Sequence, residues 1–168
     1  GLRAPHRTLQ ERGQHMAVVN ATQTLTLAGN AVDAETVTIG GQVYTWETGA
    51  LDASGKVLVG ASAAASIQNL FDAINGTGTP GTQYHASTPL NPVVRASALT
   101  ATTLVVQSKL GGVIGNLIAV AEAMTQGSWG AANLAGGTGD LGLDIKNFLL
   151  SSGAQMSRDL GQYLREIA

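Results

Sequence analysis

The sequence has no cysteine, few aromatic residues and few charges. Without cysteine, this chain of 168 residues has no disulfides, thiolate metal ligands or cysteine nucleophiles. Charged residues make up 12% of the chain, about half the usual share of roughly 25% in globular proteins. No apolar run approaches the ~18–20 residues that span a bilayer, so no membrane partner is expected. The net charge of −2 argues against nucleic acid as the main partner.

The residues that are abundant, 22 glycines and 17 threonines, favour short strands and many turns. Charges are distributed unevenly, since residues 16–140 hold three cations and seven acids while both flanking segments are richer in charge. We therefore predict a β-rich structural domain over 16–140 and a C-terminal helical segment over 141–168. Residues 1–15 are either an N-terminal arm or a non-native extension, with Met16 as the native start in the second case.

Alternating apolar and polar residues predict strands throughout the middle segment. We expect them at 21–27, 36–39, 43–46, 57–59, 82–86, 93–97 and 102–109, with extended structure over 115–123 and a weak strand over 129–135. Gly40-Gly41 is a two-residue hairpin signal. The stretch 50–57 matches a phosphate-binding loop only in part, so we interpret it as a hairpin loop. We interpret residues 136–140 as a linker.

One helix is predicted inside this domain, over about 62–75. Ser62 is a suitable N-cap and Asn75-Gly76 a left-handed stop. Between them, apolar residues recur at helical spacing: Ile67, Leu70, Phe71 and Ile74. The predicted fold class is α+β, a mainly antiparallel β domain with one packed helix, plus an N-terminal extended arm and C-terminal helices.

The two terminal segments carry the residues that we predict to contact other subunits. An ordered basic arm is expected to dock on a partner, which makes Arg3, Arg7 and Arg12 interface residues. The C-terminal segment has two apolar stripes separated by a break near 151–153, and an amphipathic helix needs an apolar surface from its own chain or a neighbour. One stripe consists of Ile145, Phe148 and Leu149, the other of Met156, Leu160, Tyr163, Leu164 and Ile167, and all of these except Ile145 are predicted interface residues.

No combination of residues predicts an active site, a metal site or a cofactor site. The glycine-rich stretch 76–81 follows a predicted helix and contains a proline, unlike a dinucleotide-binding loop. His85 is the only histidine outside the arm, and no G-x-S-x-G motif is present. Asp33 and Glu35 are interpreted as solvated turn residues rather than a catalytic pair.

Four aromatic residues could form a platform for sugars or fill the core: Tyr44, Trp46, Tyr84 and Trp129. Aromatic residues this sparse in a chain with few charges favour the core.

Five segments follow one another in the middle of the chain: ATQTLTLAGNAVDAETVTIGGQVYTW (21–46), VLVGASAAASIQNLFDAIN (57–75), GTQYHAST (81–88), LGGVIGNLIAVAE (110–122) and SWG (128–130). In this order they resemble a module that recurs in structural proteins of tailed bacteriophages. In that module a DTVTIG…YTF hairpin precedes an IGASAAAT–NL–AAIN helix and then a GNSIA–E strand. This chain departs from it with Trp46 in place of the commoner Phe, and with Ile114 and Leu117 inside the last element. The resemblance covers roughly residues 20–136 and implies no catalytic residues.

The leading hypothesis is therefore a non-enzymatic structural protein of a tailed-phage virion, either a capsid decoration (cement) protein or a tail or appendage component. It would be made in the bacterial cytoplasm and bind identical subunits and other virion proteins in the particle. The alternative is an adhesin-like module that binds host-surface glycan through Trp46, Tyr84 or Trp129. A third hypothesis is a glycan hydrolase that uses Asp33, Glu35 and Glu47.

Overall fold

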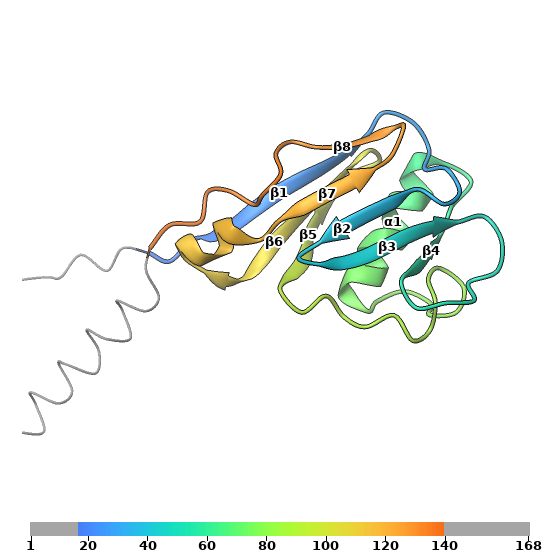
Figure 1. Ribbon diagram of the computed structural model, residues 1–168, viewed down its shortest axis with the longest axis horizontal. Coiled ribbons are helices and arrows are strands. Elements are labelled where there is room, and N and C mark those ends of the chain that lie inside the picture. The colour runs from blue at the N-terminus through green and yellow to red at the C-terminus, as the bar shows by residue number, and fades with distance from the viewer. Residues whose placement is uncertain (1–16, 140–168) are drawn as a thin grey trace, which may run out of the picture. The chain divides into compact units, whose positions relative to one another are not determined.

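The structure, a computed structural model, describes residues 17–139 (Figure 1). The predicted α+β class is confirmed for this part of the chain, which has mainly antiparallel strands and one α-helix. In chain order the elements are β1 (Asn20–Leu27), β2 (Thr36–Ile39), β3 (Gln42–Glu47), β4 (Lys56–Leu58), α1 (Ala63–Asn75), β5 (Val94–Leu99), β6 (Thr103–Gly111), the 3-10 helix η1 (Val113–Leu117), β7 (Val120–Ala123) and β8 (Gly127–Trp129).

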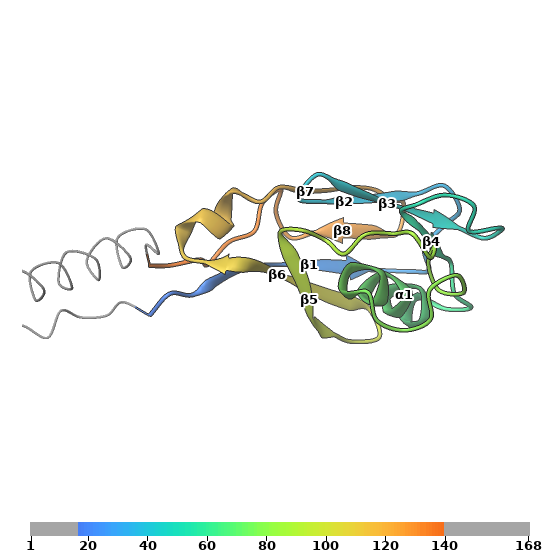
Figure 2. The ribbon, with the colours of Figure 1, turned by 90° about the horizontal axis from the view of Figure 1, so that it is seen from below.

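The strands form two sheets of four, which Figure 2 shows as two layers. The first sheet has the order β5-β6-β1-β8 and is antiparallel throughout. In its centre Leu25 of β1 lies opposite Leu104 of β6, and both side chains are buried. Threonines alternate with the leucines along β1, so one face of this strand is apolar, as the sequence predicts.

The second sheet has the order β4-β3-β2-β7. Gly40 and Gly41 form the turn between β2 and β3 with φ of 57° and 85°. Both values lie in the left-handed region, which glycine adopts without steric cost. The predicted hairpin is confirmed.

The connection from β3 to β4 differs from the hairpin loop that the sequence indicated. Trp46 of β3 lies opposite Val57 of β4 in a parallel pair, so residues 48–55 carry the chain back to the start of β3. Parallel neighbours ordinarily need a connection of about a dozen residues. The connection between β3 and β4 is shorter than that, which is why the sequence indicated an antiparallel hairpin here, and that prediction is wrong.

The ends of α1 are those that the sequence predicts. The Ser62 hydroxyl accepts a hydrogen bond from the Ala65 N–H at 3.3 Å. Gly76 stands at the other end with φ of 64°, and its N–H donates to the Asp72 carbonyl. Because both ends are capped, the 13-residue helix stops cleanly before the next loop.

Two asparagines attach α1 to the outer strands of the two sheets. The Asn69 amide donates to the Leu58 carbonyl of β4 at 3.0 Å. The Asn75 side chain both donates to the Ala96 carbonyl of β5 and accepts from its N–H, at 3.0 and 2.9 Å. The amide group thus pairs with β5 as a neighbouring strand would, and α1 covers this edge of the first sheet (Figure 2).

The core lies between the two sheets and α1. Its largest buried side chains are Trp46, Tyr44, Tyr84, Leu25, Leu27, Ile39, Ile67, Leu70, Ile74, Leu104, Leu134 and Val37. The preference of the aromatic residues for the core is confirmed for Tyr44, Trp46 and Tyr84.

Three predicted segments are wrong in detail. Residues 82–86 form turns rather than a strand, and only Tyr84 makes isolated bridges, to Val57 and Pro80. Residues 115–123 are divided between η1 and β7 instead of being extended throughout. The strand expected over 129–135 lies earlier, as β8, and is followed by isolated bridges at Asn133 and Ala135.

The N-terminal arm, the C-terminal helices and all ten predicted interface residues lie outside the described residues. Their contacts and the predicted domain limits at 15 and 141 stay predictions.

Candidate functional site

The 3-10 helix η1 lies at one end of the sandwich, at the left of Figure 1. A group of apolar side chains on and beside η1 is exposed to solvent. We call it the η1 face, and it consists of Leu110, Val113, Ile114 and Leu117. Each is more than half exposed, and Leu117 reaches 76%. In a 3-10 helix residues i and i+3 lie one above the other, so Ile114 and Leu117 share one side of η1. Large apolar side chains grouped in this way mark interaction sites in soluble proteins.

A pocket of about 360 Å³ opens beside these side chains. It is lined by Pro92, Val93, Lys109, Leu110, Ile114, Gly115 and Ile118. The single charged residue among them is Lys109, whose ammonium group donates to the Asn91 carbonyl at 2.6 Å. None of the other lining residues has a polar side chain, so the pocket presents a mainly apolar interior.

The backbone beneath η1 explains why its side chains point outward. A Cβ added at Gly115 would lie 2.6 Å from the Ser108 hydroxyl oxygen and 2.9 Å from the Ala21 Cβ. Only glycine permits so close an approach, and it brings η1 directly onto β1 and β6. The Ser108 hydroxyl, which is buried there, accepts from the Ala21 N–H and donates to the Leu110 carbonyl. With no space underneath, the larger side chains of η1 project away from the sheet.

Residues 136–139 hold η1 from its other side and are not the linker that the sequence indicated. The Asn116 side chain donates to the Gly137 carbonyl at 3.0 Å and accepts from its N–H at 2.9 Å. The Val113 N–H donates to the Gly139 carbonyl, and Thr138 pairs with Val19. The two ends of the described chain therefore lie next to the η1 face.

At the other end of the sandwich, acidic side chains bind the backbone of their own loops. Asp33 accepts from the N–H and hydroxyl of Thr48 at 2.7 and 2.9 Å, and these bonds lower the pKa of its carboxyl. Glu35 accepts from the N–H and hydroxyl of Thr125, both at 2.6 Å, and from the Val32 N–H. Partial burial acts to raise the pKa of Glu35, but the bonds from Thr125 and Val32 outweigh it and lower that pKa.

Glu47, Asp52 and Lys56 form an ion-pair cluster at the same end. The Lys56 ammonium group lies 2.7 Å from the Asp52 carboxylate and 2.5 Å from that of Glu47. The bonds to Asp52 and Glu47 raise the pKa of Lys56, and the Lys56 bond and charge lower the pKa of Asp52. This cluster fixes the loop between β3 and β4.

Asp72 is a buried carboxylate of α1 whose neighbours are hydroxyl and amide groups. It accepts from the Thr77 hydroxyl at 2.7 Å, from the Gln83 amide at 2.9 Å and from the Gln68 amide at 3.1 Å. The Tyr84 hydroxyl donates to the Thr77 carbonyl at 2.8 Å. These bonds anchor the loop that follows α1, and they occupy both oxygens of the carboxylate.

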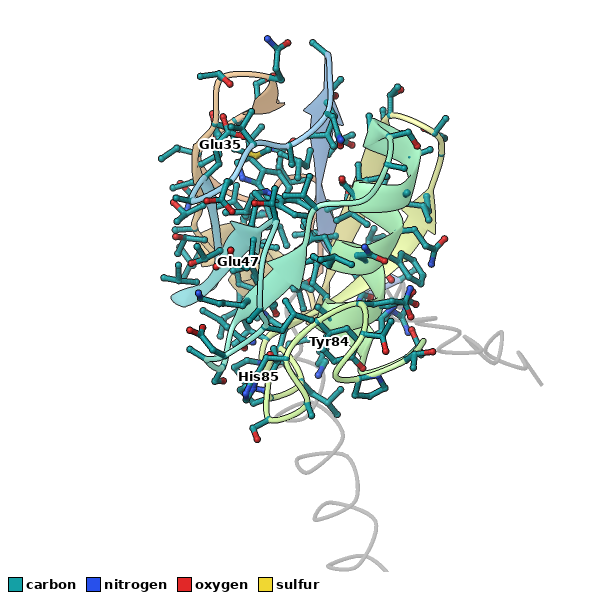
Figure 3. All side chains as sticks on the ribbon, turned by 90° about the vertical axis from the view of Figure 1, so that its right-hand side faces the viewer. Glu35, Glu47, Tyr84 and His85 are labelled. Carbon is teal, nitrogen blue, oxygen red and sulfur yellow. The ribbon has the colours of Figure 1, made fainter. Side chains whose placement is uncertain are left out.

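The side chains that the hydrolase hypothesis needs converge only in part, because Asp33 and Glu47 are neighbours whereas Glu35 lies apart from Glu47. Glu35, Glu47 and His85 lie at separate places in Figure 3 rather than around one point. The His85 Nδ1 accepts from the Ser87 N–H at 3.1 Å. Among residues 17–139, no group of three histidine or acidic side chains is placed to hold a metal ion.

The aromatic platform of the glycan hypothesis is largely buried. Trp46 is 1% and Tyr84 2% exposed, so neither ring offers a face to a sugar. Trp129 is partly buried, and its indole N–H donates to the Ala121 carbonyl at 3.1 Å.

Comparison with models of protein families, with curated proteins and with solved structures found no match to this chain. Within the described part of the chain, no helix is long and apolar enough to cross a bilayer.

The η1 face is the feature of the structure from which function is inferred below. The sequence analysis did not predict this face. One signal was present: Val113 and Ile114 stand between Gly112 and Gly115, a pattern that fits neither a strand nor an α-helix.

Proposed function

We propose that this chain is a non-enzymatic structural protein of a tailed-phage virion and makes subunit contacts as a capsid decoration (cement) protein or a tail or appendage component. Its partners are identical subunits and other virion proteins, and its place is the assembled particle. The phage assignment is supported by the resemblance of residues 20–136 to the recurrent virion module.

The η1 face is the observation that carries this proposal. Burial of a leucine side chain is worth roughly 1.5–3 kcal/mol, so four apolar side chains in water favour association. A chain that works as a free monomer gains nothing from this exposure and risks aggregation. A virion subunit covers such a face when the particle assembles.

The placement of charge supports the same function. Residues 17–139 contain three cations and six acids, and Asp33, Glu35, Glu47 and Asp52 bind groups of their own chain. Interface cores are depleted of charged residues. A surface with so few charged side chains suits contact with other neutral protein surfaces.

The proposal is tested by mass spectrometry of density-gradient-purified particles of the phage that encodes this chain. We expect its peptides at a constant ratio to the major capsid protein across the particle peak, also after a high-salt wash. A phage-encoded replication protein serves as the control and should disappear from the peak. Absence of the chain from washed particles would refute the proposed function.

The terminal segments are tested separately, by light scattering on the full chain and on variants without residues 1–15 or 141–168. If the predicted contacts of Arg3, Arg7 and Arg12 or of the C-terminal stripe from Met156 to Ile167 hold an oligomer together, the corresponding deletion lowers its mass. An oligomer of unchanged mass would contradict those predicted contacts.

A further inference from the structure

We propose that the η1 face is a two-fold interface between two copies of this chain, in which Leu117 of each copy enters the pocket beside Ile114 of the other. This inference rests on the proposed function and deepens it, because it names one surface through which identical subunits meet.

Leu117 is the projecting part of this interface. It is 76% exposed, more than any other large apolar residue of the described chain. The Gly115 backbone rests on Ser108 and Ala21, so η1 cannot sink toward the sheet to cover this side chain. The bonds between Asn116 and Gly137 hold η1 in place. Leu117 is thus presented on a fixed support, which lowers the entropy lost on binding.

The pocket is the receiving part. Its volume of about 360 Å³ exceeds the ~150 Å³ of an engineered cavity that accommodates benzene. Leu110 and Ile114 line it and are themselves about half exposed, so they belong both to the pocket and to the surface around it. A leucine side chain entering it would be surrounded by Val93, Ile114 and Ile118.

A second copy is the occupant that this combination favours. In a two-fold interface each subunit must offer both halves of every contact, and here one face carries a projecting leucine and an apolar pocket. Charge sets little of the contact, because Lys109 is the single charged side chain that lines the pocket and its ammonium group donates to the Asn91 carbonyl of its own chain.

The size of the η1 face suits the centre of such an interface. Four half-exposed side chains provide on the order of 300 Å² of apolar surface, the size of a large patch on a monomer. Each partner of a standard interface buries about 800 Å². The η1 face would therefore form the core, and polar neighbours such as Asn116 and Asn133 the rim.

The first experiment is sedimentation equilibrium of the full chain from 1 to about 200 μM, a range that covers typical weak and moderate self-association. We expect a monomer–dimer equilibrium that is at least about tenfold weaker in Leu117→Lys. Val32→Lys is the matched control, because Val32 is also an exposed apolar residue (49%) but lies in the loop after β1. It should dimerise like the wild type.

The second experiment uses the absence of cysteine from the chain. Leu117→Cys and Leu110→Cys are purified separately, mixed and oxidised. A two-fold contact that inserts Leu117 beside Leu110 predicts a disulfide-linked heterodimer in excess of either homodimer. Leu117→Cys mixed with Val32→Cys is the control and should give little heterodimer. Equal yields in the two mixtures would contradict the inferred geometry.

The outcomes separate this inference from the proposed function. A wild type that remains monomeric, or a dimer that Leu117→Lys leaves intact, overturns the two-fold interface even if the chain is found in particles. A monomeric wild type whose binding to particles is lost in Leu117→Lys also overturns it, because the η1 face would then contact a different virion protein. A Leu117-dependent dimer that is absent from particles supports the interface and refutes the virion assignment.

Discussion

The two ends of the sandwich are held in place by different chemistry. At the end with the loops after β1 and β3, acidic side chains bind backbone N–H groups, hydroxyls and Lys56. At the η1 end, amide side chains and the close approach of glycine backbone hold the segments together. Figure 1 shows these ends on opposite sides of the strands.

This difference shows where the surface is available to another protein. At the acidic end the carboxylates accept hydrogen bonds from their own loops, and the surface there is charged rather than apolar. At the η1 end the polar groups are satisfied inside the chain while the apolar side chains remain in water. The free energy to be gained by association therefore lies at the η1 end.

The largest expected effect on stability comes from Asn91, a fully buried residue behind the pocket. Its side-chain oxygen accepts from the Val93 and Val94 N–H groups, each at 3.1 Å, and its amide donates to the Ile39 carbonyl at 3.0 Å. Asn91→Ala leaves these groups buried without partners. We expect the free energy of unfolding in urea to fall by about 3 kcal/mol.

Asn133→Ala is the control for this measurement, because Asn133 is an exposed asparagine near the same end. It should change the free energy of unfolding by less than about 0.5 kcal/mol. A similar loss in both variants would mean that Asn91 does not join the strands as described.

The next effect tests whether the two ends are held independently. Asn116→Ala removes both bonds to Gly137 and should lower stability by about 1 kcal/mol. Hydrogen exchange should become faster at the Val113 and Thr138 amides, which lie on either side of the lost contact. The Thr125 amide, bound to Glu35 at the other end, is the internal control. Faster exchange at Thr125 as well would show that the ends are coupled.

A smaller effect is expected at the acidic end and depends on pH. In the folded chain the pKa of Glu35 lies below its ordinary value of 4.5, so its carboxylate stabilises the fold fully above that pH. This stabilisation is lost as the pH falls through the lowered pKa. Glu35→Gln should cost about 1 kcal/mol at pH 7 and lose less stability than the wild type on acidification.

Urea unfolding at pH 7 and at several values below 4.5 measures this dependence, with Glu122→Gln of β7 as the exposed control. Asp33 and Asp52 also have lowered pKa values, so part of the wild-type acid sensitivity should remain in Glu35→Gln. If the difference between wild type and Glu35→Gln is constant with pH, Glu35 does not act through its charge.

Local signals in the sequence were sufficient for much of the fold. Ser62 and Gly76 set the ends of α1, and Gly40-Gly41 sets the first hairpin, because caps and two-residue turns depend on only a few neighbouring residues. Residues 82–86 were mistaken for a strand because Tyr84 is apolar between polar neighbours. Its burial depends on contacts with Val57 and Pro80, which alternation does not reveal.

The η1 face could not be predicted from neighbouring residues, because its exposure also depends on tertiary contacts. Ile114 and Leu117 occur in an apolar stretch that is ordinarily read as core. Their exposure follows from Gly115 resting on Ser108 and on Ala21, which is distant from it in sequence. The predicted interface residues lie in the terminal segments because a basic arm and an amphipathic period are visible there in the sequence. Exposure of a 3-10 helix is decided by tertiary packing.

The smallest expected effect on the fold concerns Leu117 itself. At protein concentrations too low for association, Leu117→Lys should change the free energy of unfolding by less than about 0.5 kcal/mol, because the side chain is mostly in water. At high concentration the wild type should gain stability by mass action while the variant should not, since only the wild type dimerises. Urea unfolding at two concentrations about a hundredfold apart measures this difference. A large loss of stability in the dilute variant would show that Leu117 supports its own domain, and the contrast between the two ends would then lose its functional meaning.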